Sequence, residues 1–150
     1  VFQARSLLEP IAAKTIASMR GRRAAIERLR NLIAEEEAAI GEPERFGVAN
    51  AAFHERLVSL AGNQTLTILA EMLNEIVARA VTAVSRTEDI VGSLATRRKG
   101  IRSQERLVEL IEQGDSGAVE EHWRAHMAVV SRVMLGQKAA TVIDLLDHES

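Results

Sequence analysis

The hydrophobic residues of this chain recur with the period of an α-helix along nearly its whole length. At about 100° per residue, Phe46, Phe53, Leu57 and Ala61 fall within roughly 80° of one helix face. Comparable stripes recur in the later segments, and β-branched residues do not settle into a period of two. Helix is therefore the predicted structure for most of the chain.

Glycine, proline and capping residues divide this pattern into segments of helical length. Helix stops are expected at Gly21, Gly41, Gly62, Gly100 and Gly114, N-caps at Asn63 and Asp115, and a first helical turn at Pro43. The predicted helices cover residues 2–19, 23–40, 43–61, 64–86, 89–113 (bent or interrupted near Gly92 or Gly100), 116–136 and 138–147. These lengths predict an all-α antiparallel bundle of six to seven helices.

Composition limits the class of protein further. The chain has 150 residues, of which 47% are hydrophobic and 27% charged, which suits a single domain over residues 1–150. No apolar run approaches the roughly 20 residues of a membrane span, and we expect no membrane partner and a cytoplasmic location. The absence of cysteine excludes disulfides and thiolate metal sites. The 19 basic and 21 acidic residues are mixed along the chain, so this domain is not expected to bind DNA by itself.

Five polar residues stand on the apolar faces of three predicted helices. Their positions are Asn50 and His54, then Gln104, then His122 and His126. A buried polar group without a partner costs roughly 1–3 kcal/mol, so each must meet another side chain, water, a metal or a ligand. Two interpretations stay open, a closed core of mutually bonded groups and an internal ligand cavity, and five such residues favour the cavity.

Other charged and aromatic residues have simpler interpretations. Arg5 and Glu9 are spaced as a surface ion pair on one helix. The glutamate run 35–37 is typical of a solvated face. Trp123 is interpreted as a packing or dimer contact.

Three motifs in order carry a resemblance to a known family. They are "RSLLEP" (5–10), "NAAFHERLVSLAGN" (50–63) and "LVELIEQGD" (107–115) followed by His126. With these motifs the chain resembles the FadR C-terminal domain (FCD) family, the effector-sensing and dimerising half of GntR-type bacterial transcription regulators. The resemblance implies a homodimeric sensor that controls DNA binding by an N-terminal winged helix-turn-helix domain absent from this chain.

The resemblance also implies a metal site, which this sequence alters. Many members hold a divalent metal with one Asp and three His, and these positions match Asn50, His54, Gln104 and His126. His54 and His126 remain donors for zinc or nickel, but the two amides offer only neutral oxygens, so metal affinity should fall. His122, one helical turn before His126, is a candidate replacement ligand. The alternative is a metal-free pocket in which these side chains bind the effector directly.

The expected effector is a small organic acid, for which Arg5 and Arg79 are candidate anchors unless they face outward. One competing function is a structural interaction module with a closed polar core. A metal-dependent enzyme is less favoured, because no histidine has a glutamate three residues earlier and no HExxH, P-loop or Gly-x-Ser-x-Gly motif occurs. We therefore do not expect an enzyme.

Overall fold

The computed structural model describes the backbone of residues 2–84 and 91–148 and the side chains of residues 5–73, 75–76 and 91–132. These residues form six helices and no strand, namely α1 (Phe2–Ser18), α2 (Arg22–Ala38), α3 (Pro43–Leu60), α4 (Gln64–Val84), α6 (Leu94–Gln113) and α7 (Ser116–His148). The prediction of an all-α bundle is confirmed. None of these helices is both long enough and apolar enough to cross a membrane.

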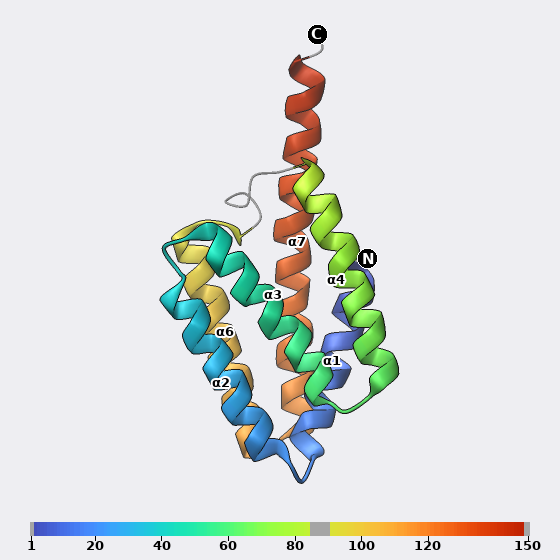
Figure 1. Ribbon diagram of the computed structural model, residues 1–150, viewed down its shortest axis with the longest axis vertical. Coiled ribbons are helices and arrows are strands. Elements are labelled where there is room, and N and C mark those ends of the chain that lie inside the picture. Colours follow the sequence, from blue (N-terminus) through green and yellow to red (C-terminus); the bar gives the residue numbers. More distant parts are fainter. Residues whose placement is uncertain (1, 85–90, 149–150) are drawn as a thin grey trace.

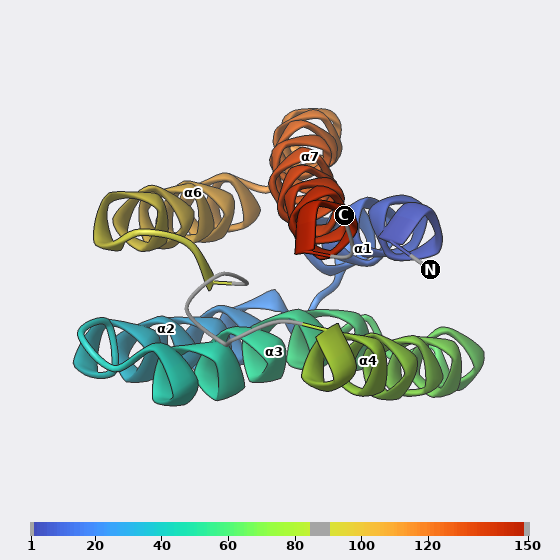
Figure 2. The same cartoon turned by 90° about the horizontal axis from the view of Figure 1, so that it is seen from above.

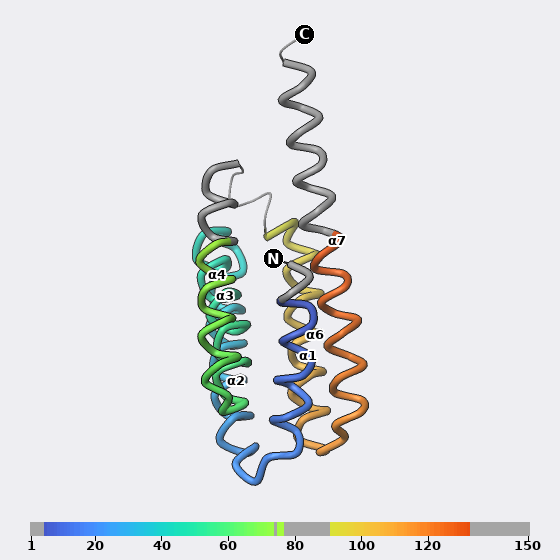
Figure 3. The backbone as a smooth tube through the Cα atoms, turned by 90° about the vertical axis from the view of Figure 1, so that its right-hand side faces the viewer, coloured from blue at the N-terminus to red at the C-terminus, as the bar shows by residue number. Residues whose placement is uncertain are grey.

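The helices pack in two layers. Seen from above, α1, α6 and α7 make one layer and α2, α3 and α4 make the other (Figure 2). Successive helices run in opposite directions (Figure 1), and the side view separates the two layers along their length (Figure 3). Contacts of α1 with α3 and of α2 with α6 join the layers. The core between them contains Ile16, Leu29, Phe53, Leu107 and Trp123, all completely buried.

Most predicted helix ends are confirmed by their capping contacts. Asn63 Oδ1 accepts the amide of Leu66 at 3.1 Å, and Asp115 Oδ1 accepts the amide of Ala118 at 3.1 Å. Pro43 occupies the first turn of α3. Gly62 and Gly114 have φ values of 77° and 73°, a left-handed conformation that glycine adopts without strain.

One predicted break is absent, one falls at the alternative position, and two glycines at correct breaks have another conformation than expected. Gly100 lies inside α6, and the interruption expected at Gly92 or Gly100 falls at Gly92, which has a φ of 76° and is followed by the N-cap Ser93. Gly21 and Gly41 lie between helices as predicted, but neither adopts the left-handed conformation expected of a helix stop. The break expected near residue 137 is absent, since α7 runs from 116 to 148. A glycine inside a helix costs only about 1 kcal/mol, which favourable flanking residues offset. The predicted boundaries at 86 and 89 lie outside the described residues.

Candidate functional site

Two glutamates are buried between the helix layers. Glu9 of α1 is 2% exposed and Glu36 of α2 is 0% exposed. Both continue the apolar faces of their helices: Glu36 follows Leu29 and Ile33, and Glu9 lies one or two turns before Ala13 and Ile16. The prediction of a solvated face for residues 35–37 is therefore wrong at Glu36. The helical spacing to these apolar residues is the sequence signal that could have found both glutamates, whereas their charge led to the surface prediction.

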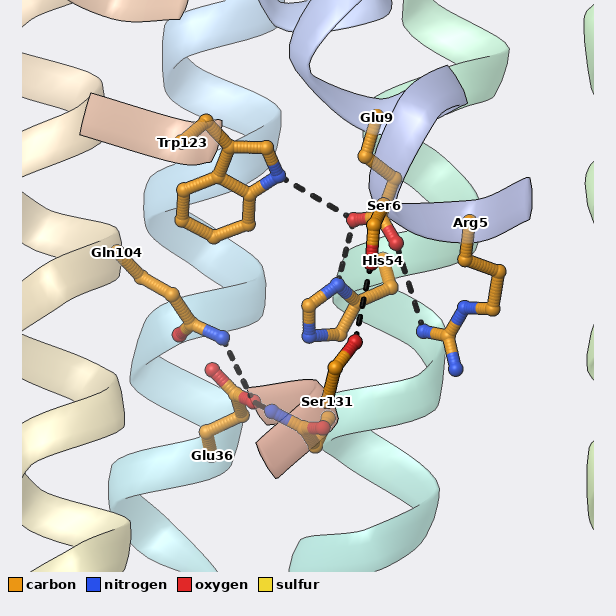
Figure 4. A network of polar contacts seen from close by, with 9 residues as sticks. Arg5, Ser6, Glu9, Glu36, His54, Gln104, Trp123 and Ser131 are labelled. Atoms are coloured by element: carbon orange, nitrogen blue, oxygen red, sulfur yellow. Dashed lines mark hydrogen bonds and ion pairs between the residues drawn. The ribbon is translucent and has the colours of Figure 1, made fainter. Parts of the chain in front are cut away.

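Glu9 is held by donors from three helices (Figure 4). Its Oε1 accepts from Nδ1 of His54 at 2.6 Å and from Nε1 of Trp123 at 3.3 Å. Its Oε2 lies 3.5 Å from the guanidinium of Arg5. Burial raises the pKa of Glu9, but the contacts with His54, Arg5 and Trp123 outweigh it, so the net pKa is below the usual value. The predicted ion pair of Arg5 and Glu9 is present, but its predicted place at the surface is wrong, since the two side chains are only 13% and 2% exposed.

Glu36 is held by two carboxamides. Its Oε1 accepts from Nδ2 of Asn50 at 2.7 Å and from Nε2 of Gln104 at 3.2 Å, the latter bond being drawn in Figure 4. The second carboxylate oxygen, Oε2, has no hydrogen-bond partner, and neither has Oε1 of Gln104. Burial raises the pKa of Glu36 more than its two hydrogen bonds lower it.

The histidines divide into two groups. His54 and His126 stack with ring centroids 6.2 Å apart, and His126 also stacks on Trp123 at 4.2 Å. Burial lowers the pKa of His126 from 6.5 to about 3, so its imidazole is neutral at pH 7. His122 instead turns toward α6, where its Nε2 donates to the carbonyl oxygen of Ser103 at 2.8 Å. That bond fixes the proton on Nε2, because a carbonyl oxygen can only accept.

The structure thus brings together Asn50, His54, Gln104 and His126, and adds Glu9, Glu36 and Trp123. Arg5 reaches the cluster only through Glu9. His122 is engaged by Ser103, and the side chain of Arg79 lies outside the described residues. We call Glu9, Glu36, Asn50, His54, Gln104, Trp123 and His126 the buried polar cluster, in which Asn50 and His126 are half-buried and the others are buried.

The buried polar cluster fits a metal poorly. At the two substituted positions, Asn50 and Gln104 direct N–H groups at Glu36. In the part of the chain that the structure describes, no group of three His, Asp, Glu or Cys side chains could hold a metal ion. The contact from Glu9 to Nδ1 of His54 would orient an imidazole for coordination. One oriented histidine does not make a site without further anionic or imidazole ligands around it.

Comparison with known proteins gives one family. The family model of the FCD domain matches residues 1–129, a range that contains every member of the buried polar cluster. No curated protein matches the chain.

The contacts of Glu9 generate a prediction about stability. Replacing Glu9 by Ala should lower the free energy of unfolding by about 3–5 kcal/mol, because it leaves the buried donors of His54 and Trp123 unpaired and Arg5 without its anion. Urea denaturation measures the change. The matched control is Glu35→Ala at an exposed position of α2, expected to change stability by about 0.5 kcal/mol or less. Equal effects of the two substitutions would contradict the burial of Glu9.

His126 generates a prediction about pH. Because its pKa is lowered from 6.5 to about 3 in the folded chain, its contribution to stability is complete above pH 6.5 and is lost as the pH falls below that value. Between pH 7 and pH 5 this loss should be about 1 kcal/mol in urea denaturation, allowing for partial solvent screening. His126→Phe keeps the stacking on Trp123 and should flatten the profile over that range. Parallel pH profiles for the two proteins would exclude this role of His126.

Proposed function

Since this chain belongs to the FCD domain family, the FadR C-terminal domain of GntR-type transcription regulators, we propose that it senses a small effector that binds in the buried polar cluster. Domains of this family are regulatory and bind effectors rather than catalyse reactions. The observation that supports the location is the pair of buried oxygens without partners, Glu36 Oε2 and Gln104 Oε1.

The unpartnered oxygens favour a sensor over a closed structural core. A polar core that serves only packing is expected to satisfy each buried group, because an unsatisfied one costs stability. Here five helices direct polar side chains into a region that aliphatic residues would fill more stably. The proposed ligand cavity lies beside these oxygens, among Glu36, His54, Gln104 and His126.

We propose that the effector is bound directly, without zinc or nickel. The side-chain N–H groups of Asn50 and Gln104 donate to Glu36. Among the described residues, no three His, Cys, Asp or Glu side chains are placed to hold a metal ion. The predicted organic acid has one described anchor, Arg5, whose guanidinium already lies 3.5 Å from Glu9. An acidic group on the effector would therefore compete with Glu9 for Arg5.

In the regulator, we propose, an N-terminal winged helix-turn-helix domain makes the DNA contacts and this domain sets the spacing of two such units. A net charge of −2 gives this domain no general attraction to phosphate, which supports the division of labour. Effector binding would shift the dimer between arrangements that match or miss the operator half-sites.

Helix α4 offers the surface for that dimer. Its side chains Ile68, Leu69, Met72 and Ile76 are 57%, 43%, 56% and 49% exposed and fall on one side of the helix. A contiguous exposed apolar stripe of this kind is typical of a contact surface. We propose that two copies of the chain pair through α4 in a symmetric homodimer.

A thermal-shift screen of the chain tests the sensor. At least one small organic compound should raise the melting temperature, and EDTA should not remove the rise. Gln104→Met should weaken the response, while Gln113→Met, at an exposed position of the same helix, should retain it. No shift with organic acids, amines or sugars would contradict the sensor, and destabilisation by EDTA would contradict direct binding.

The dimer surface is tested by placing a charge in it. Met72→Glu should convert a dimer to a monomer in sedimentation equilibrium, because two carboxylates would be buried opposite each other in a symmetric contact. Val48→Glu, at a 74% exposed position of α3, should leave the dimer intact. A monomeric parent chain, or a Met72→Glu chain that still dimerises, would exclude pairing through α4.

A further inference from the structure

The two unpartnered oxygens lie on neighbouring side chains. Glu36 and Gln104 are joined by the 3.2 Å hydrogen bond from Gln104 Nε2 to Glu36 Oε1. The remaining oxygen of each, Glu36 Oε2 and Gln104 Oε1, is buried and accepts nothing. Figure 4 shows both side chains meeting between the helices, with His54 nearby. When Glu36 is ionised both atoms are acceptors, so a group that satisfies them must donate hydrogen bonds.

The charges around these oxygens differ from those around Glu9. Arg5 lies within 3.5 Å of Glu9, whereas in the described part of the chain Glu36 has carboxamide donors and no lysine or arginine in an ion pair. His126 is neutral at pH 7 because burial lowers its pKa to about 3. His54 interacts with Glu36 through its charge, but its Nδ1 is bonded to Glu9. An ionised Glu36 therefore has no cation in direct contact, and the most favourable donor for its free oxygen is a positively charged one.

We propose that Glu36 Oε2 and Gln104 Oε1 accept hydrogen bonds from a cationic nitrogen group, an ammonium or a guanidinium, so that the effector is an amine-bearing molecule. This inference rests on the proposed sensor function and specifies its ligand. A carboxylate placed here would face the Glu36 carboxylate and donate nothing. An effector with both amine and acid groups satisfies the oxygens through its amine.

The test compares cations that carry N–H donors with one cation that carries none. Methylammonium, guanidinium and 1,4-diaminobutane should raise the melting temperature of the chain by about 2–4 °C at roughly five times the dissociation constant. Tetramethylammonium carries the same charge as methylammonium without an N–H group and should give no rise beyond that of equimolar sodium chloride.

Two substitutions link the response to the named atoms. Glu36→Gln introduces an amide N–H that can satisfy Gln104 Oε1 and removes the negative charge, so this variant should fold with a melting temperature at or above that of the parent and lose the amine response. Gln104→Met removes the other acceptor and should weaken the response. The control Glu35→Gln, at an exposed site one residue away, should keep it.

The outcomes separate this inference from the sensor function. Equal shifts with methylammonium and tetramethylammonium, or an undiminished response in both Glu36→Gln and Gln104→Met, would overturn the amine site. A rise with acetate or succinate alone would overturn it and leave the sensor standing. A rise with zinc chloride alone would replace it with a metal site. No rise with any compound would overturn both proposals.

Discussion

The burial of two carboxylates is the constraint on which the interior of this bundle depends. A buried carboxylate is tolerated only where donors surround it, since removing it from water costs several kcal/mol. Glu9 meets this need with groups from α1, α3 and α7, and Glu36 meets part of it with groups from α3 and α6. These contacts tie the two layers together at defined points. The polar interior therefore fixes the relative placement of helices that aliphatic packing alone would position less specifically.

The two carboxylates are unequally satisfied, and this difference separates structure from function. Both oxygens of Glu9 are engaged, which keeps its pKa low and fixes the positions of His54 and Trp123. One oxygen of Glu36 is engaged and the other is not, and burial keeps its pKa raised. Glu9 thus behaves as a structural support for the histidine beside it. Glu36 retains acceptor capacity, which is the basis of the proposed effector site.

The fold could be predicted from periodicity and capping because both are local. Asn63, Asp115 and Gly114 act on residues within one helical turn, and each was placed correctly. The tendency of glycine to end a helix was overestimated at Gly100, which lies inside α6. The residues that flank a glycine decide whether the helix continues. Periodicity also identified Gln104 and His54 as inward-facing, and both are buried.

The partners of the polar residues could not be predicted in the same way. The bonds from Glu9 to His54 and from Glu36 to Gln104 span 45 and 68 residues, so they exist only after the helices pack. The charge of Glu9 and Glu36 led to the prediction that both lie on the surface. In the structure both lie in the interior, on the apolar faces of their helices. Periodicity and the family resemblance both identified Asn50 and Gln104 as positions of interest, but only the packed structure shows their N–H groups directed at Glu36.

The central claim is that Glu9 and Glu36 are both buried but unequally supplied with hydrogen-bond donors. Its most direct test is a carbon-13 NMR titration of the glutamate carboxyl groups, assigned with Glu9→Gln and Glu36→Gln variants. The account predicts that the Glu9 signal titrates below the usual value near 4.5 and the Glu36 signal above it. Two signals that both titrate near 4.5, as solvated carboxylates do, would contradict it.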